Sequence, residues 1–193
     1  SLPLIGRSEP MQEVYRIISR VMNTDLTVLI EGESGTGKEL AAQAIHELQS
    51  DKKGPFKALD LAAMPTDRIS QDLFGTPENP GIAFDPGATL YLDEIGDLPA
   101  EAQTQLVKLM REAGSARIIA STRKPLSALV EEGRFREDLF YRINVVRVFM
   151  PPLRQRKEDV PELVRAFLIR AQRKGLPNKQ VEPAAMDLIM AYD

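Results

Sequence analysis

The sequence predicts an α/β fold in which a five-stranded parallel sheet lies between two layers of helices. Short apolar runs alternate along the chain with segments whose apolar residues recur every three or four positions. The first run leads into a glycine-rich turn, a lysine and a helical pattern, which is the order found around phosphate-binding loops. Because strands that alternate with helices pair in parallel, we expect helices on both faces of the sheet.

Each expected strand is a short run of β-branched and other apolar residues. The strands are expected at residues 26–31, 56–61, 88–92, 117–121 and 144–150. Each expected helix carries its apolar residues on one face. Helices are expected at residues 8–22, 38–49, 66–74, 97–113, 126–132 and 136–141. Ser8 is a suitable N-cap, Pro99 suits a first helical turn, and the prolines and glycines of residues 76–87 favour a loop.

The pattern changes after Pro151 and Pro152, where strands give way to helices. Residues 157–174 have one apolar face and end at Gly175 and Pro177, and a further helix is expected at 183–192. We therefore expect two parts, an α/β subdomain at residues 1–152 and an incomplete helical lid at residues 153–193.

Composition excludes several classes of protein. A chain of 193 residues with 43% hydrophobic and 27% charged residues is long enough for one well-buried core. The net charge of −3 is not the basic balance that is typical of nucleic-acid-binding domains. The absence of cysteine excludes disulfides and thiolate metal sites. No apolar run approaches the roughly 20 residues of a membrane span, and the start has no signal-peptide pattern. We expect a cytoplasmic protein, with His46 on a helix face rather than on a metal.

Residues 32–39 form the predicted phosphate-binding loop. Gly32, Gly35 and Gly37 permit positive φ and a close approach of backbone N–H groups to an anion. The helix that follows adds its unpaired N–H groups, and Lys38 would reach the β- and γ-phosphates. Glu39 stands where the general motif has Ser or Thr, the residues that hold Mg²⁺.

Two further groups of polar residues follow predicted strands. Asp93 and Glu94 follow an apolar strand, where an aspartate can hold Mg²⁺ and a neighbouring carboxylate can deprotonate a water molecule. Thr122 and Arg123 follow the next strand, where polar side chains can sense a γ-phosphate or simply leave the sheet. The arginines of residues 133–142 read by composition alone as a solvated helix face.

Segments along most of the chain resemble the AAA+ domain of the NtrC-like bacterial enhancer-binding proteins, which activate sigma-54 RNA polymerase. The matching segments are residues 5–8, 32–39, 72–75, 90–97, 133–142 and 151–154. Glu is usual after the loop lysine in this family, so Glu39 supports the resemblance. The fold implied is a P-loop AAA+ three-layer sandwich with a helical lid.

The resemblance also implies roles for single residues. ATP or ADP would bind the loop residues Gly32, Glu33, Ser34, Gly35, Thr36, Gly37, Lys38 and Glu39, with Ile5 and Gly6 on the adenine side. Asp93 would be the Walker B carboxylate for Mg²⁺ and Glu94 the catalytic one. Arg136 and Arg142 match arginine fingers that act across a subunit boundary in a hexameric or heptameric ring. Asp60, Thr122 and Arg123 stand at or near sensor positions.

The chain departs from the family in four places. The Gly-Ala-Phe-Thr-Gly-Ala loop that contacts the sigma factor is absent between Gly75 and Gly87, and the hairpin before the sensor strand is missing at residues 112–117. Asp60 replaces an asparagine that communicates with the catalytic glutamate, and Arg123 stands near an Asn or His position. The chain stops before the segment that carries the second sensor. These losses fit a subgroup of NtrC-like regulators that lack the loop.

We therefore expect the ATP-binding, ATP-hydrolysing central domain of a bacterial transcription regulator whose nucleotide controls ring assembly. Its partners would be further copies of itself, RNA polymerase holoenzyme, and DNA through a C-terminal domain outside these residues; no membrane partner is expected. Sigma-54 remodelling is not expected without the contact loop. Two alternatives stay open: a nucleotide-switched assembly module with little or no ATPase activity, and a small-molecule kinase, which is disfavoured because no acceptor lid is found.

Overall fold

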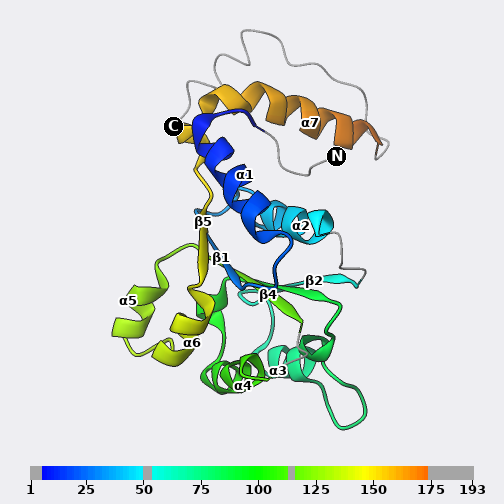
Figure 1. Cartoon of the computed structure of the whole chain (residues 1–193), viewed down its shortest axis with the longest axis vertical. Helices are drawn as coiled ribbons and strands as arrows, with labels where there is room; N and C mark the ends of the chain where they lie inside the picture. The colour runs from blue at the N-terminus through cyan, green and yellow to red at the C-terminus, as the bar shows by residue number, and fades with distance from the viewer. Residues whose placement is uncertain (1–5, 50–53, 113–115, 174–193) are drawn as a thin grey trace.

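The computed structural model describes residues 6–49, 54–112 and 116–173, and within them the sheet is parallel and five-stranded (Figure 1). The strand order is β2-β3-β4-β1-β5. The strands are β1 Val28–Glu31, β2 Phe56–Asp60, β3 Thr89–Asp93, β4 Arg117–Thr122 and β5 Val146–Phe149. All five expected strands are therefore present, each within about two residues of its expected bounds.

Helices cover both faces of this sheet, as expected (Figure 1). The helices are α1 Glu9–Val21, α2 Lys38–Leu48, α3 Thr66–Phe74, α4 Ala100–Met110, α5 Leu126–Glu131, α6 Glu137–Ile143 and α7 Val160–Arg173. The described residues also contain four short 3₁₀ turns, η1 Ile82–Phe84, η2 Ile95–Asp97, η3 Leu153–Gln155 and η4 Lys157–Asp159. None of the described helices is both long and apolar enough to span a bilayer.

Alternation along the strands divides the core into two layers. Val28 and Ile30 of β1 pack with α1 and α2, whereas Leu29 between them packs with the helices on the opposite face. The same alternation occurs in β3, where Tyr91 faces α2 while its neighbours Leu90 and Leu92 face away. A parallel sheet buried on both faces explains why these strands are nearly continuous apolar runs.

Several expected bounds were wrong for local reasons. Residues 95–97 form a 3₁₀ turn, so the helix expected from 97 begins only at Ala100. Residues 157–159 form another, so the next expected helix begins at Val160. The expected loop at 76–87 contains η1, whose Ala83 carbonyl accepts a hydrogen bond from the N–H of Ala116. The helix expected at 183–192 lies outside the described residues.

Ser8 is the N-cap residue of α1, as expected, but its side chain does not cap the helix. The Ser8 hydroxyl makes no capping bond to α1 but donates to Oδ2 of Asp159, 151 residues away, over 2.5 Å. Oδ1 of Asp159 accepts the N–H groups of Arg7 and Ser8 at 2.7 and 3.0 Å, and Arg156 donates to Oδ2 at 3.0 Å. Asp159 therefore acts as the acceptor at the start of α1 and ties it to the segment that leads into α7.

A buried arginine joins the opposite end of α1 to the sheet. The Arg117 guanidinium at the start of β4 donates to the carbonyls of Val21, Met22 and Leu26 and to the amide oxygen of Gln49. Burial lowers the pKa of Arg117 while the nearby Asp25 raises it. Four acceptors around one guanidinium explain how a charged residue occupies a strand position with only 3% exposure.

Strand register decides where the polar residues lie. Asp60 of β2 pairs with Asp93 of β3, Leu92 pairs with Ala120 of β4, and Glu31 of β1 pairs with Thr122. The carboxyl ends of β1, β2, β3 and β4 therefore meet at one edge of the sheet, where ligands bind in open α/β folds.

Candidate functional site

A cavity of about 540 Å³ opens at this edge of the sheet. Its walls come from the glycine-rich loop and the start of α2 on one side and from the ends of β2, β3 and β4 on the other. The lining residues are Ser34, Gly35, Gly37, Lys38, Glu39, Leu40, Asp60, Ala62, Tyr91, Asp93, Glu94 and Arg123. The volume falls within the range of about 300–1,000 Å³ typical of small-molecule sites.

The glycine-rich loop has the positive φ values that its sequence permits. Gly35 and Gly37 have φ values of 78° and 93°, in the left-handed region that favours glycine. A Cβ atom on Gly32 would lie 2.9 Å from both the carbonyl oxygen of Met150 and Oγ1 of Thr36. These glycines let the loop turn tightly between β1 and α2, so that backbone N–H groups at the start of α2 face the cavity.

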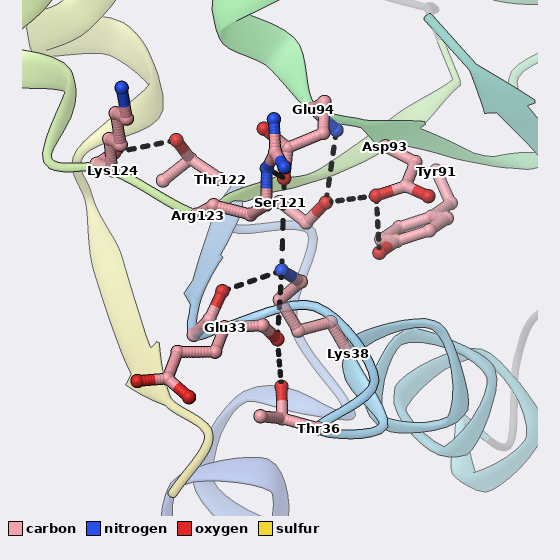
Figure 2. Close-up of polar contacts among 11 residues, drawn as sticks. Glu33, Thr36, Lys38, Tyr91, Asp93, Glu94, Ser121, Thr122, Arg123 and Lys124 are labelled. Atoms are coloured by element: carbon pink, nitrogen blue, oxygen red, sulfur yellow. Dashed lines mark hydrogen bonds and ion pairs between the residues drawn. The ribbon is translucent and has the colours of Figure 1, made fainter. Parts of the chain in front are cut away.

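Lys38 is the central cation of the site (Figure 2). Its Nζ donates to the carbonyl oxygens of Gly32 and Glu33 at 2.6 and 3.3 Å and lies 3.7 Å from Oε1 of Glu94. The side chain is 7% exposed; burial lowers its pKa, while Glu94 and Asp93 raise it. A buried ammonium whose present partners are mostly neutral carbonyls is well placed to bind an anion.

Asp93 and Glu94 form the acidic wall opposite the lysine (Figure 2). Oδ1 of Asp93 accepts a hydrogen bond from Oγ of Ser121 at 2.7 Å and one from the Tyr91 hydroxyl at 3.5 Å. Oγ of Ser121 also accepts the N–H of Glu94 at 3.2 Å. Glu94 adopts φ = 59°, the positive φ of a non-glycine residue that often marks functional sites.

The Glu94 carboxylate is surrounded by cations but lacks a hydrogen-bond donor at Oε1. Nε of Arg123 lies 3.4 Å from this oxygen, and the Glu94 side chain is 16% exposed. Oε1 is fully buried and accepts no hydrogen bond within the described part of the chain. A buried acceptor of this kind costs free energy unless a group such as a water molecule binds it.

The acidic wall also fits Mg²⁺ that arrives with phosphates. No group of three His, Asp or Glu side chains in the described ranges could hold a metal by itself. Mg²⁺ in nucleotide sites commonly uses one or two carboxylates together with phosphate oxygens and water. Asp93, fixed by Ser121 and facing the cavity, is a suitable carboxylate for such an ion.

Some expected site residues lie elsewhere. Thr122 is 1% exposed, and its hydroxyl donates to the carbonyl of Lys124 rather than facing the cavity. Gly6 packs against Asp159, and Ile5 lies outside the described residues. Gly32, Glu33 and Thr36 shape the loop behind the cavity wall without lining it.

The two finger candidates stand away from the cavity at the start and end of α6. Arg136 pairs through two hydrogen bonds of 2.9 Å with the carboxylate of Asp138, and a third of 3.0 Å joins it to Oγ1 of Thr104. The Arg142 side chain is exposed. Neither arginine lines the cavity of its own chain.

Sequence reasoning missed Ser121 and Tyr91, the two residues that hold Asp93. The strand register contained the signal, because Leu92 pairs with Ala120 and the residues that follow them are Asp93 and Ser121. Tyr91 stacks on Phe56 with ring centroids 6.2 Å apart, and burial raises the pKa of its hydroxyl. From the sequence alone, both residues read as ordinary strand positions.

Comparison with known families places the chain in a clear context. The family model for the sigma-54 interaction domain matches residues 4–149. The DNA-binding transcriptional regulator NtrC of Azospirillum brasilense is 47% identical over 214 aligned positions, which cover 99% of this chain and 44% of that protein. NtrC of Escherichia coli (strain K12) is 44% identical and covers 93% of this chain and 43% of that protein. The chain thus spans less than half the length of these relatives.

Solved structures agree with this assignment. NtrX from Brucella abortus in complex with ADP superposes with a TM-score of 0.88 at 36% identity, over 100% of this chain and 48% of that chain. The ATP complex of the same protein gives a TM-score of 0.84 over 98% of this chain and 48% of that chain. The P-loop NTPase domain of the sigma-54 transport activator from E. coli shares the fold, with a TM-score of 0.58 at 23% identity over 76% of this chain and 100% of that chain.

Proposed function

The chain belongs to the family of sigma-54 interaction domains, and we propose that it binds and hydrolyses ATP as the P-loop AAA+ domain of an NtrC-like bacterial transcription regulator. The observation that carries this proposal is the convergence of Lys38, Asp93 and Glu94 on one cavity at the carboxyl edge of the sheet. One relative at 36% identity, NtrX from Brucella abortus, is known in complex with ADP and with ATP, over 100% and 98% of this chain.

The roles of the residues follow from their positions. Lys38 and the N–H groups at the start of α2 bind the phosphates, and Asp93 holds Mg²⁺ against them. Mg²⁺ supplies charge neutralisation on the phosphate oxygens when it is bound. The carboxylate of Glu94 orients a water molecule and accepts its proton, since its Oε1 is buried and lacks a donor. Asp60 and Arg123, which line the cavity, act as sensors of the nucleotide. The assignment of Ile5 and Gly6 to the adenine side rests on the family resemblance alone, and the Thr122 hydroxyl would have to leave the carbonyl of Lys124 to act as a sensor.

The site is completed by a second copy of the chain. Arg136 and Arg142 are proposed to reach the nucleotide of a neighbouring subunit in a hexameric or heptameric ring, because neither lines the cavity of its own subunit. An arginine finger stabilises the charge that develops on the transferred phosphoryl group and contributes roughly 10³–10⁵ in rate in other systems. In this proposal Arg136 must exchange Asp138 for a phosphate when the ring forms.

We also propose that residues 1–152 form the ATPase subdomain and residues 153–193 part of a helical lid. The regulator would act in the bacterial cytoplasm on RNA polymerase holoenzyme, with DNA bound through a domain outside this chain. The short connection between Gly75 and Gly87 supports action without the sigma-54 contact loop. The A. brasilense alignment has 214 positions against 193 residues here, so at least 21 positions of that relative have no counterpart in this chain.

A second candidate function is a nucleotide-switched assembly module with little or no hydrolysis. The observation that favours it is the position of Glu94 between Lys38 and Arg123, whose charges hold the carboxylate that would have to activate water. ATP would then act as a ligand that favours one oligomeric state through differential affinity.

Nucleotide binding and turnover test these proposals separately. Calorimetric titration with ATP and Mg²⁺ should give binding to the wild-type chain and strongly weakened binding to Lys38→Ala, while the exposed Lys124→Ala serves as a charge-matched control. Unchanged affinity in Lys38→Ala would reject the site. Phosphate release should rise with protein concentration faster than linearly and drop in Arg136→Ala if the site is shared between subunits. Binding without turnover above background would favour the assembly module.

A further inference from the structure

An ion pair joins the phosphate-binding loop to the segment that leads to α7. Arg154 lies in η3, just after β5, and Glu33 is the second residue of the loop. Nη1 of Arg154 donates to Oε2 of Glu33 at 2.8 Å and Nη2 donates to Oε1 at 2.7 Å, across 121 residues of sequence. Two parallel bonds between planar groups fix direction as well as distance.

On the loop side of this ion pair, the backbone of Glu33 is hydrogen-bonded to Lys38. The carbonyl oxygen of Glu33 accepts hydrogen bonds from Nζ of Lys38 at 3.3 Å and from Oγ1 of Thr36 at 2.8 Å. A phosphate group in the cavity competes for the same ammonium. An anion that bound this ammonium would compete with the carbonyl of Glu33 for one of its two donors.

On the other side, the segment from Met150 to Asp159 is anchored at both ends. The N–H of Met150 donates to the carbonyl of Glu31 at 2.7 Å, and Met150 packs against Gly32. Asp159 binds Arg156 and the start of α1, immediately before α7. Arg154 lies between these anchors, so a displacement of its guanidinium would shift the short segment that positions the start of α7.

We propose that Arg154 is a positioning residue: through Glu33 it holds the phosphate-binding loop in its binding conformation and transmits phosphate occupancy to the segment before α7. This inference rests on the proposed nucleotide binding. Both side chains are about half exposed, at 47% and 57%, so the pair adds little to global stability. Its removal therefore leaves a folded protein in which the effect on the site can be measured.

A double-mutant cycle tests the proposal. Glu33→Gln and Arg154→Gln each break the pair with little change in size, and each should weaken ADP and ATP binding by roughly fivefold, the low end of typical coupling between sites. Glu33→Gln/Arg154→Gln should be no worse than either single variant, because the pair is already broken. A purely electrostatic effect on the phosphates predicts something else: Glu33→Gln would tighten binding and Arg154→Gln would weaken it.

The chain supplies a matched control pair. Arg147 and Glu31 form another arginine–carboxylate pair, between β5 and β1, in which Nη2 of Arg147 donates to both carboxylate oxygens at 2.8 and 2.9 Å and Nε donates to Oε1 at 3.2 Å. Neither residue belongs to the loop or to residues 150–159. Glu31→Gln and Arg147→Gln should leave nucleotide affinity within about twofold of wild type. Hydrogen exchange supplies a second readout: ADP should slow exchange in residues 150–159 of the wild type but not of Arg154→Gln.

The outcomes separate this inference from the proposed function. Opposite shifts in the two single variants, additive losses in the double variant, or equal losses in the control pair would overturn the role of Arg154. If the wild type binds nucleotide, and Arg154→Gln shows the same affinity and the same hydrogen exchange as the wild type, the role of Arg154 would be overturned as well. The proposed nucleotide site would be unaffected by that result. If the wild-type chain binds neither ADP nor ATP, the proposed function fails and this inference fails with it.

Discussion

Asp159→Ala should destabilise the protein strongly, because this carboxylate is the shared acceptor of four hydrogen-bond donors. It is 1% exposed and accepts from the N–H groups of Arg7 and Ser8, from the Ser8 hydroxyl and from Arg156. Its removal leaves the Arg156 guanidinium, itself 4% exposed, without its buried counter-ion. Breaking a buried pair in this way costs about 3–5 kcal/mol. That cost is a large share of a typical stability of about 5–15 kcal/mol.

Urea unfolding followed by circular dichroism measures this loss. The control is Asp72→Ala, which removes the exposed partner of Arg68 in a contact of 3.9 Å and should cost less than about 0.5 kcal/mol. A loss below about 1 kcal/mol for Asp159→Ala would refute the reasoning, because it would mean that water or another group replaces the carboxylate at no cost. Gly6→Ala tests the same contact from the other side, since its Cβ would lie 2.6 Å from Oδ2 of Asp159.

The same carboxylate predicts a pH dependence. Burial raises the pKa of Asp159, but hydrogen bonds from Ser8 and Arg7 and the charge of Arg156 outweigh it, and the net pKa is lowered. A lowered pKa means that the stabilisation is present above the unfolded value of about 3.9 and is lost as the pH falls through the folded value. The free-energy difference between wild type and Asp159→Asn should therefore be constant near neutral pH and shrink below about pH 4. A difference that widens in acid would contradict this assignment.

Three further variants probe other contacts. Gly32→Ala should cost about 1–3 kcal/mol, because its Cβ would press on the carbonyl of Met150, and a thermal scan should show a lower Tm; an unchanged Tm would show that the loop relaxes freely. Ser121→Ala removes the donor to Asp93 and should raise the Mg²⁺ concentration needed for ATP binding by roughly tenfold in a Mg²⁺ titration, whereas an unshifted curve would exclude this role. Arg117→Met removes the guanidinium donor of the Met22 and Leu26 carbonyls, while the Val21 carbonyl keeps the N–H and hydroxyl of Thr24. This variant should cost more than about 2 kcal/mol in urea unfolding, and a smaller loss would mean that water satisfies the two carbonyls.

Local patterns predicted most of the fold because its elements are locally encoded. The central strands β1, β3 and β4 are buried on both faces and therefore read as apolar runs. The phosphate-binding loop is specified by glycines whose φ values of 78° and 93° only that residue adopts easily. Bounds failed where a 3₁₀ turn precedes a helix, as at residues 95–97, because such turns share the composition of a first helical turn.

The site was only partly predictable for the same reason. Lys38, Asp93 and Glu94 were expected to act on one nucleotide, and they line one cavity. Whether Thr122 turns into the cavity or toward Lys124 depends on a rotamer and on a neighbouring carbonyl, which no sequence pattern reports. The same holds for Ser121, whose importance depends on its register beside Asp93.

The sequence by itself determined the parallel sheet, the phosphate-binding loop and the family, because each rests on residues that are close along the chain. The tertiary structure alone decided which charged groups that are far apart in the sequence contact one another. It placed Asp159 at the start of α1, Arg154 on Glu33, and Lys38 and Arg123 beside Glu94. Burial and distance set the strength of these contacts, and both exist only once the chain has folded.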